Sequence, residues 1–137
     1  SKEKSVSFHL NKKQIWEKAL PMMTTPVKQT NYYTGLVMEN EVQKSGLTAL
    51  SHFTMLNPGA ISYYAGKPIT AKYMEGANLS RSNMMEGNVC IETWKYDPLF
   101  IGEDGYVDKL SLYLSLKEHT DERVQIALDE LLNEFLW

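Results

Sequence analysis

The segment VCIETWKYDP, residues 89–98, combines a β-strand pattern with a cluster of charged side chains. Its apolar, β-branched and aromatic residues predict a strand over Val89–Tyr96, which the following Asp-Pro pair ends. Side chains alternate between the two faces of a strand. Glu92 and Trp94 should therefore share one face, and Lys95 should lie on the other.

Two carboxylates and a lysine so close together are also typical of metal-dependent nucleases. In nucleases of the restriction-enzyme type, an acid and a lysine separated by one residue lie on the same face of a strand. Glu92 and Lys95 are three positions apart, so only a β-bulge would bring them together. The spacing favours a strand end with solvated charges. An enzyme that uses Glu92 with Asp97 or Asp108 and a divalent metal is the alternative.

Composition limits the classes of function that fit this chain. The 137 residues are 43% hydrophobic, enough for one core but too few for two domains. The net charge is −3, and Arg81 and Arg123 are the only arginines, which disfavours nucleic-acid binding by this chain alone. A single cysteine, Cys90, excludes an intrachain disulfide and predicts a reducing, cytoplasmic setting. No apolar run approaches the roughly 18 residues of a membrane span.

The chain divides into a short polar start and one predicted domain. Residues 1–8 are typical of a linker or a domain boundary, and residues 9–137 are expected to form a single domain of the effector or dimerisation type. Helices are predicted from Asn11 to Pro21 and from Ser45 to Leu56, with Asn11 as the cap of the first. The first should bury one face, made of Ile15, Trp16, Ala19 and Leu20.

Further strands are predicted over Asn31–Met38 and Ile61–Tyr64, whereas residues 75–88 are predicted to be a loop and Gly102–Gly105 a turn. The stretch Lys67–Met74 fits either a helix or a strand. Leu110–Leu116 also fits both, because it alternates strictly but follows a potential cap, Asp108; the helix is favoured.

The C-terminal helix has the clearest pattern. Thr120 or Asp121 should cap it, and its buried stripe is predicted to contain Val124, Ala127, Leu128, Leu131 and Phe135. These elements together predict an α+β or α/β fold with a small central sheet flanked by helices and the C-terminal helix packed on the sheet.

No catalytic, metal or cofactor site is predicted. His9, His52 and His119 are isolated from one another and from Cys90, which is expected to be a small buried hydrophobe. Aromatic and charged side chains suggest instead a surface for a small ligand or a partner protein. The residues predicted to form it are Tyr32, Tyr64, Trp94, Lys95, Tyr96 and Asp97.

Four stretches also carry a resemblance to a known family: Trp16–Pro21 with Pro26–Lys28, Ser45–Leu50, Glu92–Pro98, and Val107–Leu116 before Asp121–Val124. In order and spacing they resemble the C-terminal domain of bacterial winged-helix transcriptional regulators, MarR-like and similar to abortive-infection antitoxin regulators. Lys109 departs from the Asp-Pro pair usual in that family. The resemblance implies that a DNA-reading winged helix precedes Ser1, and that this domain is a degenerate restriction-endonuclease-like fold without its catalytic residues.

The leading hypothesis is therefore a non-catalytic effector or partner-binding domain of a cytoplasmic bacterial transcriptional regulator. It would bind a protein partner, a second copy of itself or a small ligand, and would reach DNA only through the upstream domain. The alternatives are the metal-dependent nuclease and an antitoxin domain that masks a toxin protein.

Overall fold

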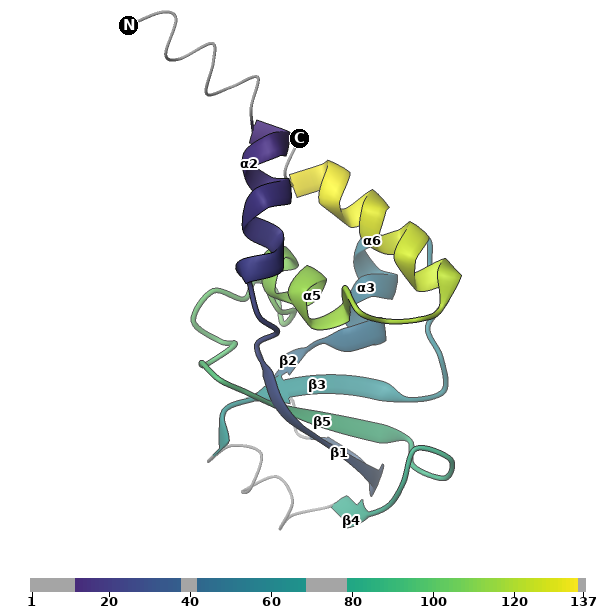
Figure 1. Cartoon of the computed structure of the whole chain (residues 1–137). Helices are drawn as coiled ribbons and strands as arrows, with labels where there is room; N and C mark the ends of the chain where they lie inside the picture. Colours follow the sequence, from purple (N-terminus) through teal and green to yellow (C-terminus); the bar gives the residue numbers. More distant parts are fainter. Residues whose placement is uncertain (1–11, 38–41, 69–78, 136–137) are drawn as a thin grey trace, which may run out of the picture.

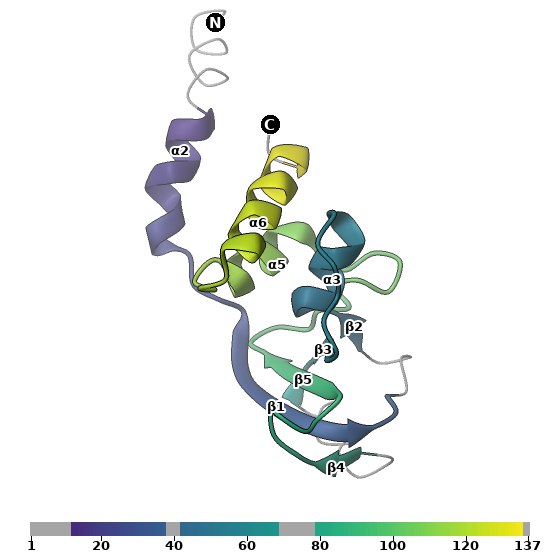
Figure 2. The same ribbon diagram turned by 90° about the vertical axis from the view of Figure 1, so that its right-hand side faces the viewer.

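The computed structural model describes residues 12–37, 42–68 and 79–135 of the chain. One five-stranded mixed sheet, in the order β2-β3-β5-β1-β4, carries a layer of helices on one face (Figures 1 and 2). The elements are α2 (Lys12–Ala19), η1 (Leu20–Met22), β1 (Val27–Gly35), β2 (Gln43–Lys44), α3 (Gly46–Phe53), β3 (Ser62–Gly66), β4 (Leu79–Arg81), β5 (Val89–Trp94), α5 (Lys109–Leu116) and α6 (Glu122–Phe135). Of the two classes that the sequence left open, α+β and α/β, the structure has α+β, and the predicted packing of the C-terminal helix against a small sheet is confirmed.

Strand β5 is the centre of this architecture. It pairs in parallel with β3 and antiparallel with β1, and all six of its residues are buried. Trp94 joins the main core under the helices, whereas Val89 and Ile91 join a second cluster on the other face of the sheet. A strand buried on both faces is apolar at most positions, which is why this segment has the strand pattern.

The helical layer follows the predicted stripes. In α6 the buried residues are Val124, Ala127, Leu128, Leu131 and Leu132, and the side chain of Phe135 lies outside the described part. Leu110–Leu116, which fitted both a helix and a strand, lies in helix α5. Asp108 caps this helix, because its Oδ2 accepts a hydrogen bond from Ser111 N at 2.9 Å and satisfies a free amide of the first turn. The choice of a helix is therefore confirmed.

Several boundaries differ from the prediction. Strand β1 begins at Val27 rather than Asn31, since its first residues pair with the end of β5 across an irregularity between Val27 and Gln29. Helix α3 ends at Phe53, where the Thr54 hydroxyl and amide both bond to Leu50 O. The three residues of β4 lie within the predicted loop 75–88 and pair with β1.

The face predicted for the first helix is partly wrong. Trp16 is buried and meets the Tyr113 ring edge-on, but Ile15 is 48% exposed, because only one side of α2 contacts the domain. Asn11 and most of the ambiguous stretch Lys67–Met74 lie outside the described residues.

Gly46 is required where β2 turns into α3. Its φ is +51°, and a Cβ atom there would lie 2.8 Å from Cγ of Tyr63. The backbone is held in this position because Ser45 N donates to Tyr63 O, and Tyr63 N donates in turn to Thr48 Oγ1 at 2.8 Å. Only glycine fits both the angle and the contact.

We expect Gly46→Ala to lower the free energy of unfolding by about 2–5 kcal/mol, since the left-handed backbone costs about 1–2 kcal/mol and overpacking adds about 1–3 kcal/mol. Urea denaturation measures this change. Gly59→Ala is the matched control, because a Cβ there meets nothing within 4 Å. Equal stabilities for the two variants would contradict this account of the turn.

Candidate functional site

Glu92 lies in the core instead of in solvent. It is 7% exposed, and its Oε1 accepts a hydrogen bond from Trp94 Nε1 at 3.0 Å. The two side chains share a face of β5, as predicted, but the prediction of solvated charges is wrong for Glu92. Its carboxyl group lies beside Trp94, which belongs to the main core under the helices.

Burial raises the pKa of Glu92 above its ordinary value of 4.5, and the hydrogen bond from the Trp94 indole, with the nearness of the Ser45 hydroxyl, offsets only part of this rise. Ser45 Oγ is itself buried without a hydrogen bond of regular geometry. The surroundings of Glu92 therefore favour its protonated, uncharged form.

Three further titratable side chains surround Glu92 on this face of the sheet. Tyr32 and Tyr63 both pair in register with Cys90, one from each neighbouring strand. Burial raises the pKa of Cys90 to about 12. Burial also raises the pKa of Tyr63 to about 12. A thiol that stays protonated is a poor nucleophile and a poor metal ligand, so this cluster has the properties of a structural network.

Lys95 and Asp97, which follow β5, lie apart from Glu92. Lys95 is exposed, and Asp97 caps its own turn by accepting from Leu99 N at 3.0 Å. Asp97 Oδ2 also lies 3.7 Å from Lys67 Nζ. Within the described part of the chain, no three His, Cys, Asp or Glu side chains come together in a way that could hold a metal ion.

The six residues predicted to form a binding surface do not share one. Trp94 is only 1% exposed, because it is a core residue, and this part of the prediction is wrong. Tyr32 lies on the face of the sheet that carries Glu92, whereas Tyr64 packs on the opposite face against Ile91 and its neighbours. Lys95, Tyr96 and Asp97 are near one another at the end of β5, where the Tyr96 hydroxyl bonds to Ser111 Oγ.

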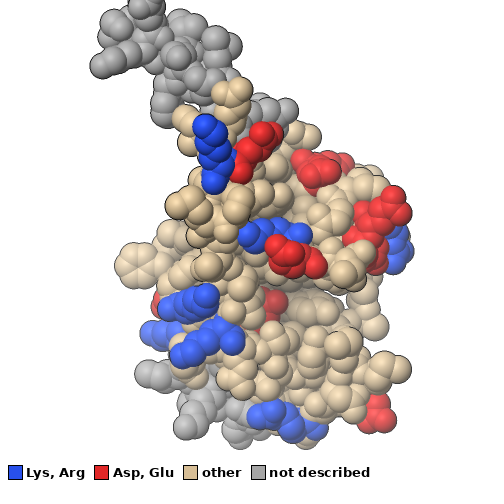
Figure 3. All heavy atoms as spheres, viewed as in Figure 1, with Lys and Arg blue, Asp and Glu red and all other residues tan. Residues whose placement is uncertain are grey.

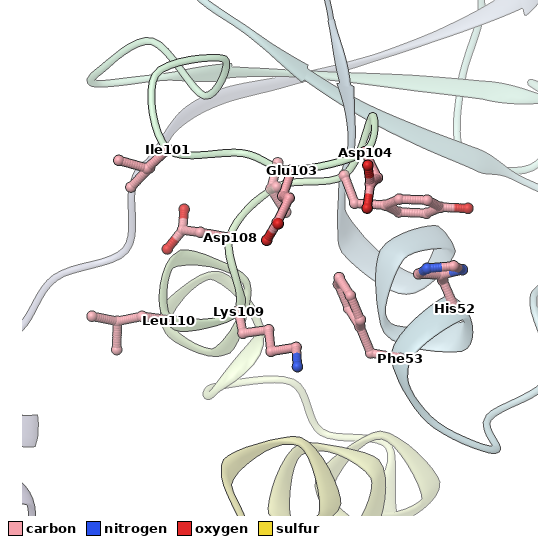
Figure 4. A pocket seen from close by; sticks show the side chains of 10 residues that line it. His52, Phe53, Ile101, Glu103, Asp104, Asp108, Lys109 and Leu110 are labelled. Atoms are coloured by element: carbon pink, nitrogen blue, oxygen red, sulfur yellow. The ribbon is translucent and has the colours of Figure 1, made fainter. Parts of the chain in front are cut away.

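A cleft of about 450 Å³ lies instead between the end of α3, the start of α5 and the loop before it (Figure 4). Its aromatic wall is continuous. The rings of His52 and Tyr106 stack with centres 3.8 Å apart and planes 9° from parallel, and Phe53 meets Tyr106 edge-on at 5.8 Å. The remaining lining residues are Ile101, Glu103, Asp104, Val107, Asp108, Lys109 and Leu110.

Charged groups are placed on several sides of this cleft. Glu103 and Lys109 point into it from opposite sides, whereas Asp108 points toward Ile101 (Figure 4). Lys109 Nζ lies 5.3 Å from the centre of the Phe53 ring and 4.0 Å from Glu134 Oε2. Asp108 Oδ1 is buried and accepts no hydrogen bond. Three carboxylates and one ammonium group line the cleft, which makes it acidic.

The turn Gly102–Gly105 positions the acidic wall. Asp104 and Gly105 both have positive φ, 56° and 84°, which reverses the chain within a few residues. Lys44 N donates to Gly105 O at 2.8 Å and Val107 N donates to Lys44 O at 3.0 Å, so the loop is tied to β2. The sequence predicted this turn, but it gave no signal that His52 would stack on Tyr106.

A scan against models of protein families, a search of curated proteins and a search of solved structures found no significant match. Within residues 12–37, 42–68 and 79–135, no helix combines the length and apolar composition that crossing a bilayer would require.

We expect Glu92→Gln to fold and to change the pH dependence of stability. A carboxyl group whose pKa is raised in the folded state stabilises that state fully below its unfolded pKa, and the contribution is lost as pH rises through the folded pKa. The free energy of unfolding of the parent chain should therefore fall as pH rises above about 4.5. Glutamine keeps an acceptor for the Trp94 indole but does not titrate, so the variant should lack this fall.

Urea denaturation at a series of pH values measures both curves. Glu118→Gln, which removes an exposed carboxylate, serves as the control and should follow the parent curve. Parallel curves for the parent and Glu92→Gln would show that Glu92 is not held in its protonated form.

Proposed function

We propose that this domain is a non-catalytic effector domain that binds a small ligand in the cleft between α3, α5 and the loop 102–108. The observation that carries the proposal is the arrangement of the cleft, where a stacked aromatic wall faces carboxylates across about 450 Å³. Sites for small molecules are typically concave, mostly apolar, and fitted with a few convergent polar groups.

The chemistry of the cleft favours an organic cation with an aromatic or apolar body. Glu103 and Asp104 offer carboxylates to an ammonium group. The rings also suit positive charge, because two lysines of the chain already lie beside them: Lys109 Nζ near Phe53, and Lys44 Nζ 5.2 Å from the centre of Tyr106. Because Lys109 already lies at the Phe53 ring, an incoming ammonium group would pair with Glu103 and Asp104 rather than with that ring.

A binding role fits the other features of the chain better than hydrolysis does. Glu92, the residue most like a catalytic acid, is engaged with Trp94 in the core. On the face seen in Figure 3, basic side chains form a small group at the left, and acidic ones gather over the helical layer at the upper right, so a continuous surface for a phosphate backbone is missing there.

The resemblance to winged-helix regulators supplies the biological setting of this proposal. In a cytoplasmic bacterial regulator, a DNA-binding domain upstream would read the operator while the present domain senses the ligand. The single cysteine, buried and with a raised pKa, is compatible with a reducing compartment.

Tyramine and 4-ethylphenol form a probe pair that tests the proposal, since they differ chiefly in the ammonium group. We expect tyramine to shift the NMR resonances of His52, Phe53 and Tyr106, and 4-ethylphenol to bind more weakly. Glu103→Gln should weaken tyramine binding about 10-fold, because a hydrogen bond to a charged group contributes about 1.5–3 kcal/mol.

Glu118→Gln removes an exposed carboxylate that does not line the cleft and should leave tyramine binding unchanged. A cation site would be contradicted if tyramine and 4-ethylphenol bound with equal affinity. It would also be contradicted if Glu103→Gln and Glu118→Gln weakened tyramine binding equally. No resonance shift at the cleft with either probe would contradict the proposal as a whole.

A further inference from the structure

A second depression, a groove of about 390 Å³, lies between α6 and the segment that follows α3. Its lining is mainly apolar and includes Leu47, Leu56 and Ala127. Two large apolar side chains at this groove are exposed to solvent, Met55 by 89% and Ile126 by 62%. Exposed apolar surface around a groove is typical of a protein–protein contact.

The side chains of α6 along this groove form a stripe of opposite charges around an apolar centre. Arg123, Ile126, Ala127 and Glu130 recur at spacings of three and four residues, which places them on one side of the helix. Arg123 comes three residues before Ile126, and Glu130 comes three residues after Ala127, so the two charges are equally far from the centre of the stripe. The stripe is positive at one end, apolar in the middle and negative at the other end.

Such a stripe is complementary to its own image. If a second α6 lies antiparallel across the first, with the two-fold axis at Ile126 and Ala127, each Arg123 faces the partner's Glu130. At the centre, the exposed Ile126 side chain of one copy then meets that of the other, whereas Ala127 is buried in the core of its own domain. A helix of another protein would need the same charge order by coincidence, whereas a second copy of this chain has it by symmetry.

The existing contacts of the charged ends permit this arrangement. Arg123 Nη2 lies 3.2 Å from Asp121 Oδ2, a pair in which the arginine side chain remains 81% exposed and keeps donors for a second carboxylate. Among the residues that the structure describes, Glu130 takes part in no ion pair.

We propose that the groove beside α6 is a homodimer interface, in which α6 of each copy packs antiparallel on α6 of the other. Met55 and Ile126 would be covered by the partner, and the two Arg123–Glu130 pairs would fix the register. This inference is independent of the ligand cleft, which is lined by different residues.

The interface is tested by reversing the charges of Arg123 and Glu130. Sedimentation equilibrium over a range of protein concentrations measures the dimer dissociation constant of each variant. The parent chain should form a dimer reversibly. Arg123→Glu places two acids opposite each other at both ends of the interface, and Glu130→Arg places two arginines there. Each single change should raise the dimer dissociation constant on the order of 10-fold, and the double variant Arg123→Glu/Glu130→Arg should restore most of the parent affinity.

These substitutions should change the association of the chain without unfolding it. Glutamate at position 123 lies in the first turn of α6, where negative charge is favourable. Asp129→Arg is the matched control: it reverses an exposed charge on the same helix but outside the groove lining. Ile126→Asp, at the centre, should abolish the dimer, and circular dichroism and urea denaturation confirm that each variant is folded.

Three results would overturn the proposal. The parent chain could remain monomeric at every concentration. The double variant could be no better than either single variant, which would exclude the Arg123–Glu130 pairing. Asp129→Arg could weaken the dimer as much as the stripe variants do, which would show that net charge rather than the stripe controls association.

Discussion

The hydrogen bond from Trp94 Nε1 to Glu92 Oε1 is the interaction on which the rest of this structure depends. Trp94 is among the largest fully buried side chains of the main core, and its indole N–H needs an acceptor once water is excluded. Glu92, two residues earlier on the same face of β5, provides that acceptor. Burial raises the pKa of this carboxyl group and so favours its uncharged form in the core, where β5 lies at the centre of the sheet with all of its residues buried.

This arrangement directs functional contacts to the helical layer and its loops. Helix α3 contributes His52 and Phe53 to the cleft and Leu47 to the groove. Its first residue, Gly46, fits against Tyr63 of the sheet, so the position of α3 is set by a contact with no spare room. The cleft and the groove are therefore built on a helix that is firmly placed, which is the arrangement that precise binding requires.

Local patterns in the sequence were sufficient to predict the elements that are stabilised by contacts between residues close together in the chain. The cap at Asp108 bonds three residues away, and the stripe of α6 reflects the period of a helix, so both could be predicted. The pattern of β5 also predicted a strand, because burial on two faces selects apolar residues. The α+β class followed from these elements.

The burial of Glu92 and the formation of the cleft depend on contacts between distant segments. Nothing near Glu92 in the sequence indicates that its side chain will be buried, and a charged residue near a strand end is usually solvated. His52 and Tyr106 are 54 positions apart in the sequence, so no local pattern indicates that their rings stack. The short β4 has too few residues for a pattern, since it is a strand only by virtue of its pairing with β1.

The protonation state of Glu92 shows whether the core holds an uncharged carboxyl group beside Trp94. The measurement is the ¹³C chemical shift of the Glu92 side-chain carboxyl carbon, followed by NMR as the pH is raised from acidic to alkaline values. A buried structural carboxyl group should keep the shift of its protonated form well above pH 4.5, its ordinary pKa. Titration at or below that value would show a solvated or charge-paired carboxylate and would contradict the account.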